Sequence, residues 1–136
     1  MTPGLVDVGA VMRGLKDFQR ATVEHTFERL FLAEDSTHRF LVADEVGLGK
    51  TMVARGVVAK AIDHLQREGV EKIDVIYICS NAEIARQNVA RLAVTRDESA
   101  CQTLRALVGY DLGSRAPAHG REVVSGGSVG VPALAG

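Results

Sequence analysis

Eight consecutive residues have the types and the spacing that hold a phosphate chain: Asp44, Glu45, Val46, Gly47, Leu48, Gly49, Lys50 and Thr51. This segment, the glycine loop, differs from the pattern Gly-x-x-x-x-Gly-Lys-Ser/Thr only where Asp44 stands in place of the first glycine. Gly47 and Gly49 carry no side chain, so the backbone N–H groups around them can converge on phosphate oxygens. The pattern therefore predicts a site for a nucleotide phosphate chain.

The last two residues of the glycine loop predict a catalytic pair. Lys50 would reach the β- and γ-phosphates as a point charge. The hydroxyl of Thr51 would be a ligand of Mg²⁺, which prefers oxygen ligands and substrate phosphates. The alternative is a glycine-containing turn between a strand and a helix, in which Lys50 and Thr51 are only solvated residues of the first helical turn.

The segments on either side determine whether the glycine loop can bind an anion. Phe40-Leu41-Val42-Ala43 is a short apolar run, typical of a strand buried on both faces. From Thr51 to about Glu68, apolar residues recur at helical spacing, and Gly69 is placed to end this helix in the left-handed conformation. A helix that begins directly after the loop offers free N–H groups and a partial positive charge to an anion.

Three further elements complete the predicted fold. Residues 16–33 have the apolar spacing of an amphipathic helix, and residues 73–79 are rich in β-branched side chains and predict a strand. Ser80 with Glu83 fits a capping box that starts a last helix, whose apolar face contains Ala85, Val89, Leu92 and Ala93. Alternating strands and helices predict the α/β class, with a parallel sheet and a right-handed βαβ unit.

Composition divides the chain into three predicted parts: a flexible N-terminus (1–14), a partial ATP-binding domain (15–112) and a disordered tail (113–136) that is rich in Gly, Ala, Ser and Pro. The 16 basic and 17 acidic residues exclude a basic nucleic-acid-binding chain as a whole. Two cysteines argue against a disulfide scaffold, and neither a signal peptide nor a membrane-spanning run is present. We therefore expect a cytoplasmic protein without a membrane partner.

Three motifs resemble those of the superfamily-two helicases and translocases, in particular the Swi/Snf-type branch and its DEAD/DEAH-like relatives. The glycine loop, preceded by Leu-Val-Ala, resembles their Walker A motif, in which Asp commonly stands at the place of Asp44. Leu15-Lys16-Asp17-Phe18-Gln19 resembles the Q-type motif, whose Gln reads the adenine edge. Residues 75–81 and 84–88 resemble the next motif, which contacts the nucleic-acid backbone. The resemblance covers about residues 15–95.

This resemblance implies an incomplete P-loop NTPase lobe of RecA-like fold, with ATP and Mg²⁺ as cofactors. It adds Gln19 to the glycine loop as an ATP-binding residue, and it points to Ser80 and Gln87 as contacts to nucleic acid, DNA in preference to RNA. From the residues alone, Gln19 is equally explained as a solvated position on an amphipathic helix, and Ser80 as a helix cap.

No Asp-Glu pair ends an apolar strand after Thr51, although the resembled family needs this second carboxylate for Mg²⁺ and water. The second motor lobe is also missing from the 136 residues. We therefore expect the N-terminal part of a nucleic-acid-dependent ATPase, truncated or frameshifted near residue 112 and unable to hydrolyse ATP alone. The alternatives are a non-catalytic nucleotide-binding module or remnant that acts through a partner chain, and a P-loop ATPase outside the helicases.

Overall fold

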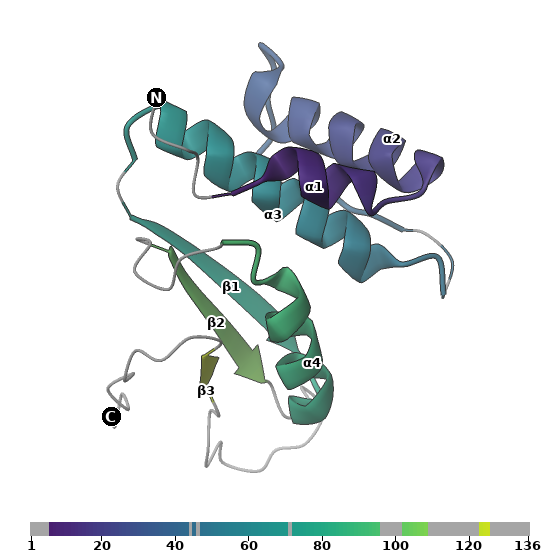
Figure 1. Ribbon diagram of the computed structural model, residues 1–136, viewed down its shortest axis with the longest axis vertical. Helices are drawn as coiled ribbons and strands as arrows, with labels where there is room; N and C mark the ends of the chain where they lie inside the picture. Colours follow the sequence, from purple (N-terminus) through teal and green to yellow (C-terminus); the bar gives the residue numbers. More distant parts are fainter. Residues whose placement is uncertain are drawn as a thin grey trace.

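A computed structural model describes residues 6–43, 45, 47–70, 72–95, 102–108 and 123–125 (Figure 1). Three helices lie side by side: α1 (Val8–Arg13), α2 (Asp17–Phe27), which continues into the π-helix η1 (Glu28–Leu32), and α3 (Lys50–Arg67). A second group of elements contains the strand β1 (Ile73–Cys79), the helix α4 (Ala82–Leu92) and the strands β2 (Gln102–Val108) and β3 (Val123–Ser125). Within the described residues, no helix combines the length and the apolar character needed to cross a membrane.

The two long helices have the extents that the sequence predicts. α2 and η1 together cover the range predicted as one helix, and the second half is wound more widely, with the Ala33 N–H donating to the Glu28 carbonyl at 2.9 Å. α3 ends as predicted at Gly69, whose φ of +86° is in the left-handed region. The N–H groups of Gly69 and Val70 donate to the carbonyls of Gln66 and Leu65, both at 3.0 Å, so the last turn of α3 is closed by a Schellman motif.

The buried face of helix α3 includes a glycine and an alanine as well as larger apolar residues. The buried positions of α3 are Val53, Gly56, Ala59 and Ile62. Gly56 lies against the buried Val23 of α2: a Cβ at Gly56 would be 2.7 Å from Val23 Cγ2. The missing side chain therefore allows the two helices to approach each other closely.

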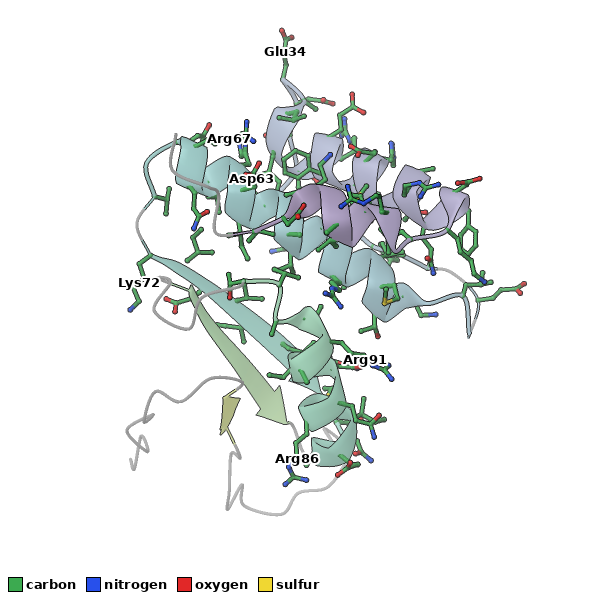
Figure 2. All side chains as sticks on the ribbon, in the orientation of Figure 1. Glu34, Asp63, Arg67, Lys72, Arg86 and Arg91 are labelled. Atoms are coloured by element: carbon green, nitrogen blue, oxygen red, sulfur yellow. The ribbon has the colours of Figure 1, made fainter. Side chains whose placement is uncertain are left out.

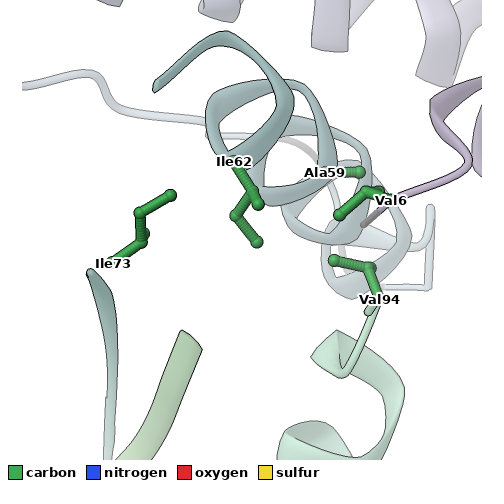
Figure 3. Packing of buried hydrophobic residues seen from close by; sticks show 5 residues of the cluster. All are labelled: Val6, Ala59, Ile62, Ile73 and Val94. Atoms are coloured by element: carbon green, nitrogen blue, oxygen red, sulfur yellow. The ribbon is translucent and has the colours of Figure 1, made fainter. Parts of the chain in front are cut away.

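A second apolar cluster joins the helices to the sheet. Val6, Ala59, Ile62, Ile73 and Val94 converge between α3, the start of β1 and the segment after α4 (Figure 3). Residues 1–14 are predicted to be flexible, but α1 forms within this segment, and the Asp7 carboxylate caps it by accepting the Ala10 N–H at 2.8 Å. Val6 is buried and forms an isolated antiparallel bridge with Thr95. Val6 packs against apolar side chains of α3 and β1, which holds the segment that leads into α1.

Residues 40–43 are not the buried strand that the sequence predicts, because they have no regular secondary structure. Leu41 is 83% exposed, and Val42 packs against the cluster of Leu15, Val23 and Val53. Phe40 meets the ring of His25 edge-on, with the centroids 5.6 Å apart. The apolar groups of this segment find helix side chains instead of neighbouring strands, which explains why the predicted strand is wrong.

The sheet contains a parallel βαβ unit, but it lies further along the chain than predicted. β1 pairs in parallel with β2, from Ile73 opposite Gln102 to Cys79 opposite Val108, and α4 connects the two strands. The side chain of Asn88 on α4 donates to the Tyr77 hydroxyl of β1 at 2.8 Å. Strand β3 pairs antiparallel with β2, although its residues belong to the segment predicted as a disordered tail; the rest of 113–136 lies outside the described residues. That this sheet belongs to a P-loop core stays a prediction.

Substitution Gly56→Ala tests the close contact of α2 and α3. Alanine normally stabilises a helix interior by about 1 kcal/mol relative to glycine. Here the added methyl group would press on the stiff, β-branched side chain of Val23, and overpacking of this kind costs about 1–3 kcal/mol. We expect a net loss of about 1 kcal/mol in the free energy of unfolding, measured by urea denaturation.

The matched control is the same substitution in a Val23→Ala background. Removing both Cγ groups clears the space that the new methyl group needs, so Gly56→Ala should then be neutral or stabilising. A stabilising effect of Gly56→Ala in the wild-type background would contradict the close approach of the two helices.

Candidate functional site

The described part of the glycine loop has a backbone that depends on its two glycines. Gly47 has a φ of +89° and Gly49 a φ of +81°, a region that residues with a Cβ adopt only at a cost. The Leu48 N–H donates to the Glu45 carbonyl at 3.4 Å, which closes the turn. Asp44 and Val46 lie outside the described residues. The turn geometry explains why this segment contains two glycines only two positions apart.

The glycine loop leads directly into the N-terminus of α3, a helix of 18 residues. Gly49 is the N-cap, and among the described residues no side chain caps this end of the helix. The carbonyl of Gly49 accepts the N–H groups of Met52 and Val53 at 2.9 and 3.2 Å, so the helical hydrogen bonds begin at once. The first N–H groups of a long helix carry a partial positive charge, which favours an anion at this place.

Lys50 and Thr51 lie in the first turn of α3, next to the loop. The side chain of Lys50 folds back over the loop and donates from Nζ to the Glu45 carbonyl at 3.3 Å. Thr51 is half-buried one residue further along the helix. The ammonium group of Lys50 therefore lies at the other end of the loop, beside Glu45. A phosphate oxygen at this place would be a stronger acceptor than the neutral carbonyl of Glu45.

Gln19 of α2 is the residue that the structure most clearly brings to the glycine loop. Its Nε2 donates to the Leu48 carbonyl at 2.9 Å, across 29 positions of the sequence. Its Oε1 accepts the backbone N–H of Lys16 at 2.9 Å, which closes the first turn of α2. Because Gln19 is only 6% exposed, the alternative of a solvated polar residue is wrong. Contact of Gln19 with adenine stays a prediction.

The two residues predicted to contact nucleic acid belong to the other group of elements. Ser80 is exposed directly after β1, and Gln87 is exposed on α4, where its side chain donates to Glu83 at 3.4 Å. The predicted cap at Ser80 is wrong by one residue, since Asn81 Oδ1 accepts the N–H groups of Glu83 and Ile84 at 2.9 and 3.1 Å. Asn81 has the extended backbone that lets its side chain reach this turn.

Basic side chains lie on the same helix as Gln87. Arg86 and Arg91 project from α4, on which Gln87 also lies (Figure 2).

A shifted pKa occurs at the turn after η1, away from the glycine loop and from α4. The Arg29 guanidinium, hydrogen bonded to Asp35 at 2.9 Å, lowers the pKa of the Asp35 carboxyl. This pair is solvent-exposed and belongs to the connection between η1 and residues 40–43.

In the described part of the chain, no group of three His, Cys, Asp or Glu side chains could hold a metal ion. The donor set that Mg²⁺ requires at the glycine loop is smaller, because this ion keeps several waters and takes the phosphates of its nucleotide as ligands. One hydroxyl ligand from the protein, that of Thr51, suits this chemistry.

Comparisons with models of protein families, with curated proteins and with solved structures find no match to this chain. Its function therefore has to be inferred from the residues themselves. The strongest basis is the glycine loop, which has a defined backbone, a helix end that no described side chain caps, and a part-buried hydrogen bond with α2. Gly49 is the residue on which all three depend.

A pair of glycine substitutions tests this geometry. An alanine at either Gly47 or Gly49 would have to adopt a left-handed conformation, which costs about 1–2 kcal/mol. A Cβ at Gly47 meets no atom within 4 Å, whereas a Cβ at Gly49 would lie 2.5 Å from Gln19 Nε2. Gly49→Ala should therefore reduce the free energy of unfolding by about 1 kcal/mol more than Gly47→Ala, because it also breaks the hydrogen bond to Leu48.

The Gln19→Ala background provides the control, since it removes the side chain that the new methyl group would meet. The two glycine substitutions should then have equal costs in urea denaturation. Equal costs in the wild-type background would mean that Gln19 does not occupy the space beside Gly49.

Proposed function

We propose that this chain binds ATP with Mg²⁺ through the glycine loop, as the N-terminal part of the ATP-binding lobe of a nucleic-acid-dependent ATPase. The observation that carries the proposal is the backbone of the loop. Two glycines at positive φ lead into a helix that no described side chain caps, and Lys50 folds back across the turn. We expect the protein to act in the cytoplasm.

The phosphate chain is the part of the nucleotide that the loop suits best. The N–H groups at the start of α3 supply donors, and the dipole of the helix favours the negative charge. Lys50 would exchange its hydrogen bond with the Glu45 carbonyl for one with a phosphate oxygen. The ammonium group is the charged donor in both bonds, but a phosphate oxygen also carries negative charge, and this added Coulomb attraction favours the exchange.

Nucleic acid is the proposed partner in the full-length family context. Ser80 and Gln87 would contact its backbone, DNA in preference to RNA, from the exposed side of the β1–α4 connection. Arg91 is also exposed on this helix and adds positive charge that phosphates attract.

A second candidate function is a nucleotide-binding module that acts through a partner chain without hydrolysing ATP. The uncovered face of β1 favours it. Val75, Tyr77 and Cys79 pack under α4, but Ile76 and Ile78 on the opposite face are 57% and 70% exposed. Exposed apolar side chains on a β-strand are typical of a surface that another chain covers. ATP hydrolysis by the purified chain would separate the two candidates, because only the first includes it.

Substitution Lys50→Ala tests the phosphate site directly. Losing charge-assisted bonds to phosphate should weaken binding of Mg²⁺·ATP by roughly ten- to a hundredfold, measured by calorimetric titration. Lys72→Ala is the matched control, because Lys72 is exposed at the start of β1, beyond the C-terminal end of α3 (Figure 2). Equal affinities of the wild type and Lys50→Ala would overturn the phosphate site.

The role of Thr51 is tested by the dependence of binding on Mg²⁺. Thr51→Ala removes the hydroxyl ligand. The affinity of this variant for ATP should therefore increase less on addition of Mg²⁺ than the affinity of the wild type does. Thr51→Ser keeps the hydroxyl and should retain the wild-type dependence. Identical Mg²⁺ dependence in the alanine and serine variants would show that Thr51 is not a ligand.

A further inference from the structure

We infer that Gln19 is a positioning residue that holds the glycine loop in its binding conformation, and that it does so for any nucleotide base. The inference rests on the proposed function, since it concerns how the same loop receives phosphates. It assigns to the Gln19 side chain a role in the conformation of the loop instead of the recognition of adenine.

Both ends of the Gln19 amide are already engaged within the protein. Oε1 accepts the Lys16 N–H and Nε2 donates to the Leu48 carbonyl, each at 2.9 Å. The first turn of α2 is itself held in place by Arg20, which donates to the Leu15 carbonyl at 2.9 Å. Gln19 therefore links a fixed helical turn to the middle of the glycine loop.

The hydrogen bond to the Leu48 carbonyl determines the orientation of the peptide unit between Leu48 and Gly49. In a trans peptide the C=O and N–H groups point in opposite directions, and the structure contains no cis peptide among its described residues. Because Gln19 draws the Leu48 carbonyl toward α2, the N–H of Gly49 points away from α2. That N–H is then oriented as a donor to an anion bound in the loop.

The contact is also so close to Gly49 that a side chain at this position would displace the amide group of Gln19. A Cβ at Gly49 would lie 2.5 Å from Gln19 Nε2 and 3.7 Å from Cδ. The side chain of Gln19 thus fills the space beside the loop backbone, and it is 6% exposed there. A base could use only the second N–H and the second lone pair of this amide, both of them in a buried environment.

Substitution Gln19→Glu separates positioning from base reading with a nearly isosteric side chain. One carboxylate oxygen can still accept the Lys16 N–H, but the other cannot donate to the Leu48 carbonyl. On acidification the neutral carboxylic acid regains an O–H donor. The donor to the Leu48 carbonyl therefore returns once the introduced carboxyl is protonated.

Two controls accompany this variant. Gln66→Glu makes the same change of charge near the far end of α3, about 24 Å along the helix from Lys50 at ~1.5 Å per residue. Gln19→Asn keeps a neutral amide but is one methylene shorter, so it loses the contact without any dependence on pH. It also keeps the inference testable if the glutamate variant does not fold.

The measurements are hydrogen-exchange protection of residues 47–52 in the nucleotide-free protein, and the affinities for ATP and GTP. At neutral pH we expect Gln19→Glu and Gln19→Asn to lose protection in the loop and to bind both nucleotides about tenfold more weakly. As the pH is lowered, Gln19→Glu should recover toward the wild type measured at the same pH, and Gln19→Asn should not. Gln66→Glu should equal the wild type throughout.

The outcomes distinguish this inference from the proposed function. Weakening confined to ATP would identify Gln19 as a base reader and overturn the positioning role. Unchanged loop protection in both Gln19 variants would overturn it while leaving ATP binding intact. If the wild type binds neither nucleotide, the proposed function fails. The positioning role is then still tested, because Gln19→Glu should lose hydrogen-exchange protection in the loop at neutral pH and regain it at lower pH.

Discussion

Helices α2 and α3 cross at Gly56, where a Cβ would lie 2.7 Å from Val23 Cγ2 and 3.2 Å from Leu15 Cδ1. This short separation places the first turn of α2 within hydrogen-bond reach of the glycine loop, so that Gln19 meets Leu48. A larger residue at Gly56 would separate the helices and draw Gln19 away from the loop. The candidate site therefore depends on a packing contact outside it, between one and two turns further along α3.

Within the site, backbone conformation and electrostatics act in the same direction. The positive φ values of Gly47 and Gly49 turn the chain so that it enters α3 with the helical N–H groups facing the loop. Lys50 adds a full positive charge across the turn. A site that concentrates donors and positive charge in this way favours a multiply charged anion over a neutral ligand, because the anion can satisfy several donors at once.

The sheet contributes less to the site than the helices do. α3 reaches it mainly through the cluster of Ala59, Ile62 and Ile73, at the beginning of β1. Beyond that point one face of β1 is covered by α4, and Ile76 and Ile78 on the other face are exposed. The helical part therefore organises the glycine loop.

Local patterns by themselves predicted the elements whose formation depends on neighbouring residues: α3 with Gly69 at its end, β1 over residues 73–79, and the glycine loop as a turn before a helix. The burial of Gln19 and the loss of the strand over residues 40–43 were decided by tertiary structure. A glutamine on an amphipathic helix becomes buried only because a loop 29 residues away supplies its partner, and an apolar run becomes a strand only where other strands offer hydrogen bonds. Neither partner is encoded in the segment that needs it.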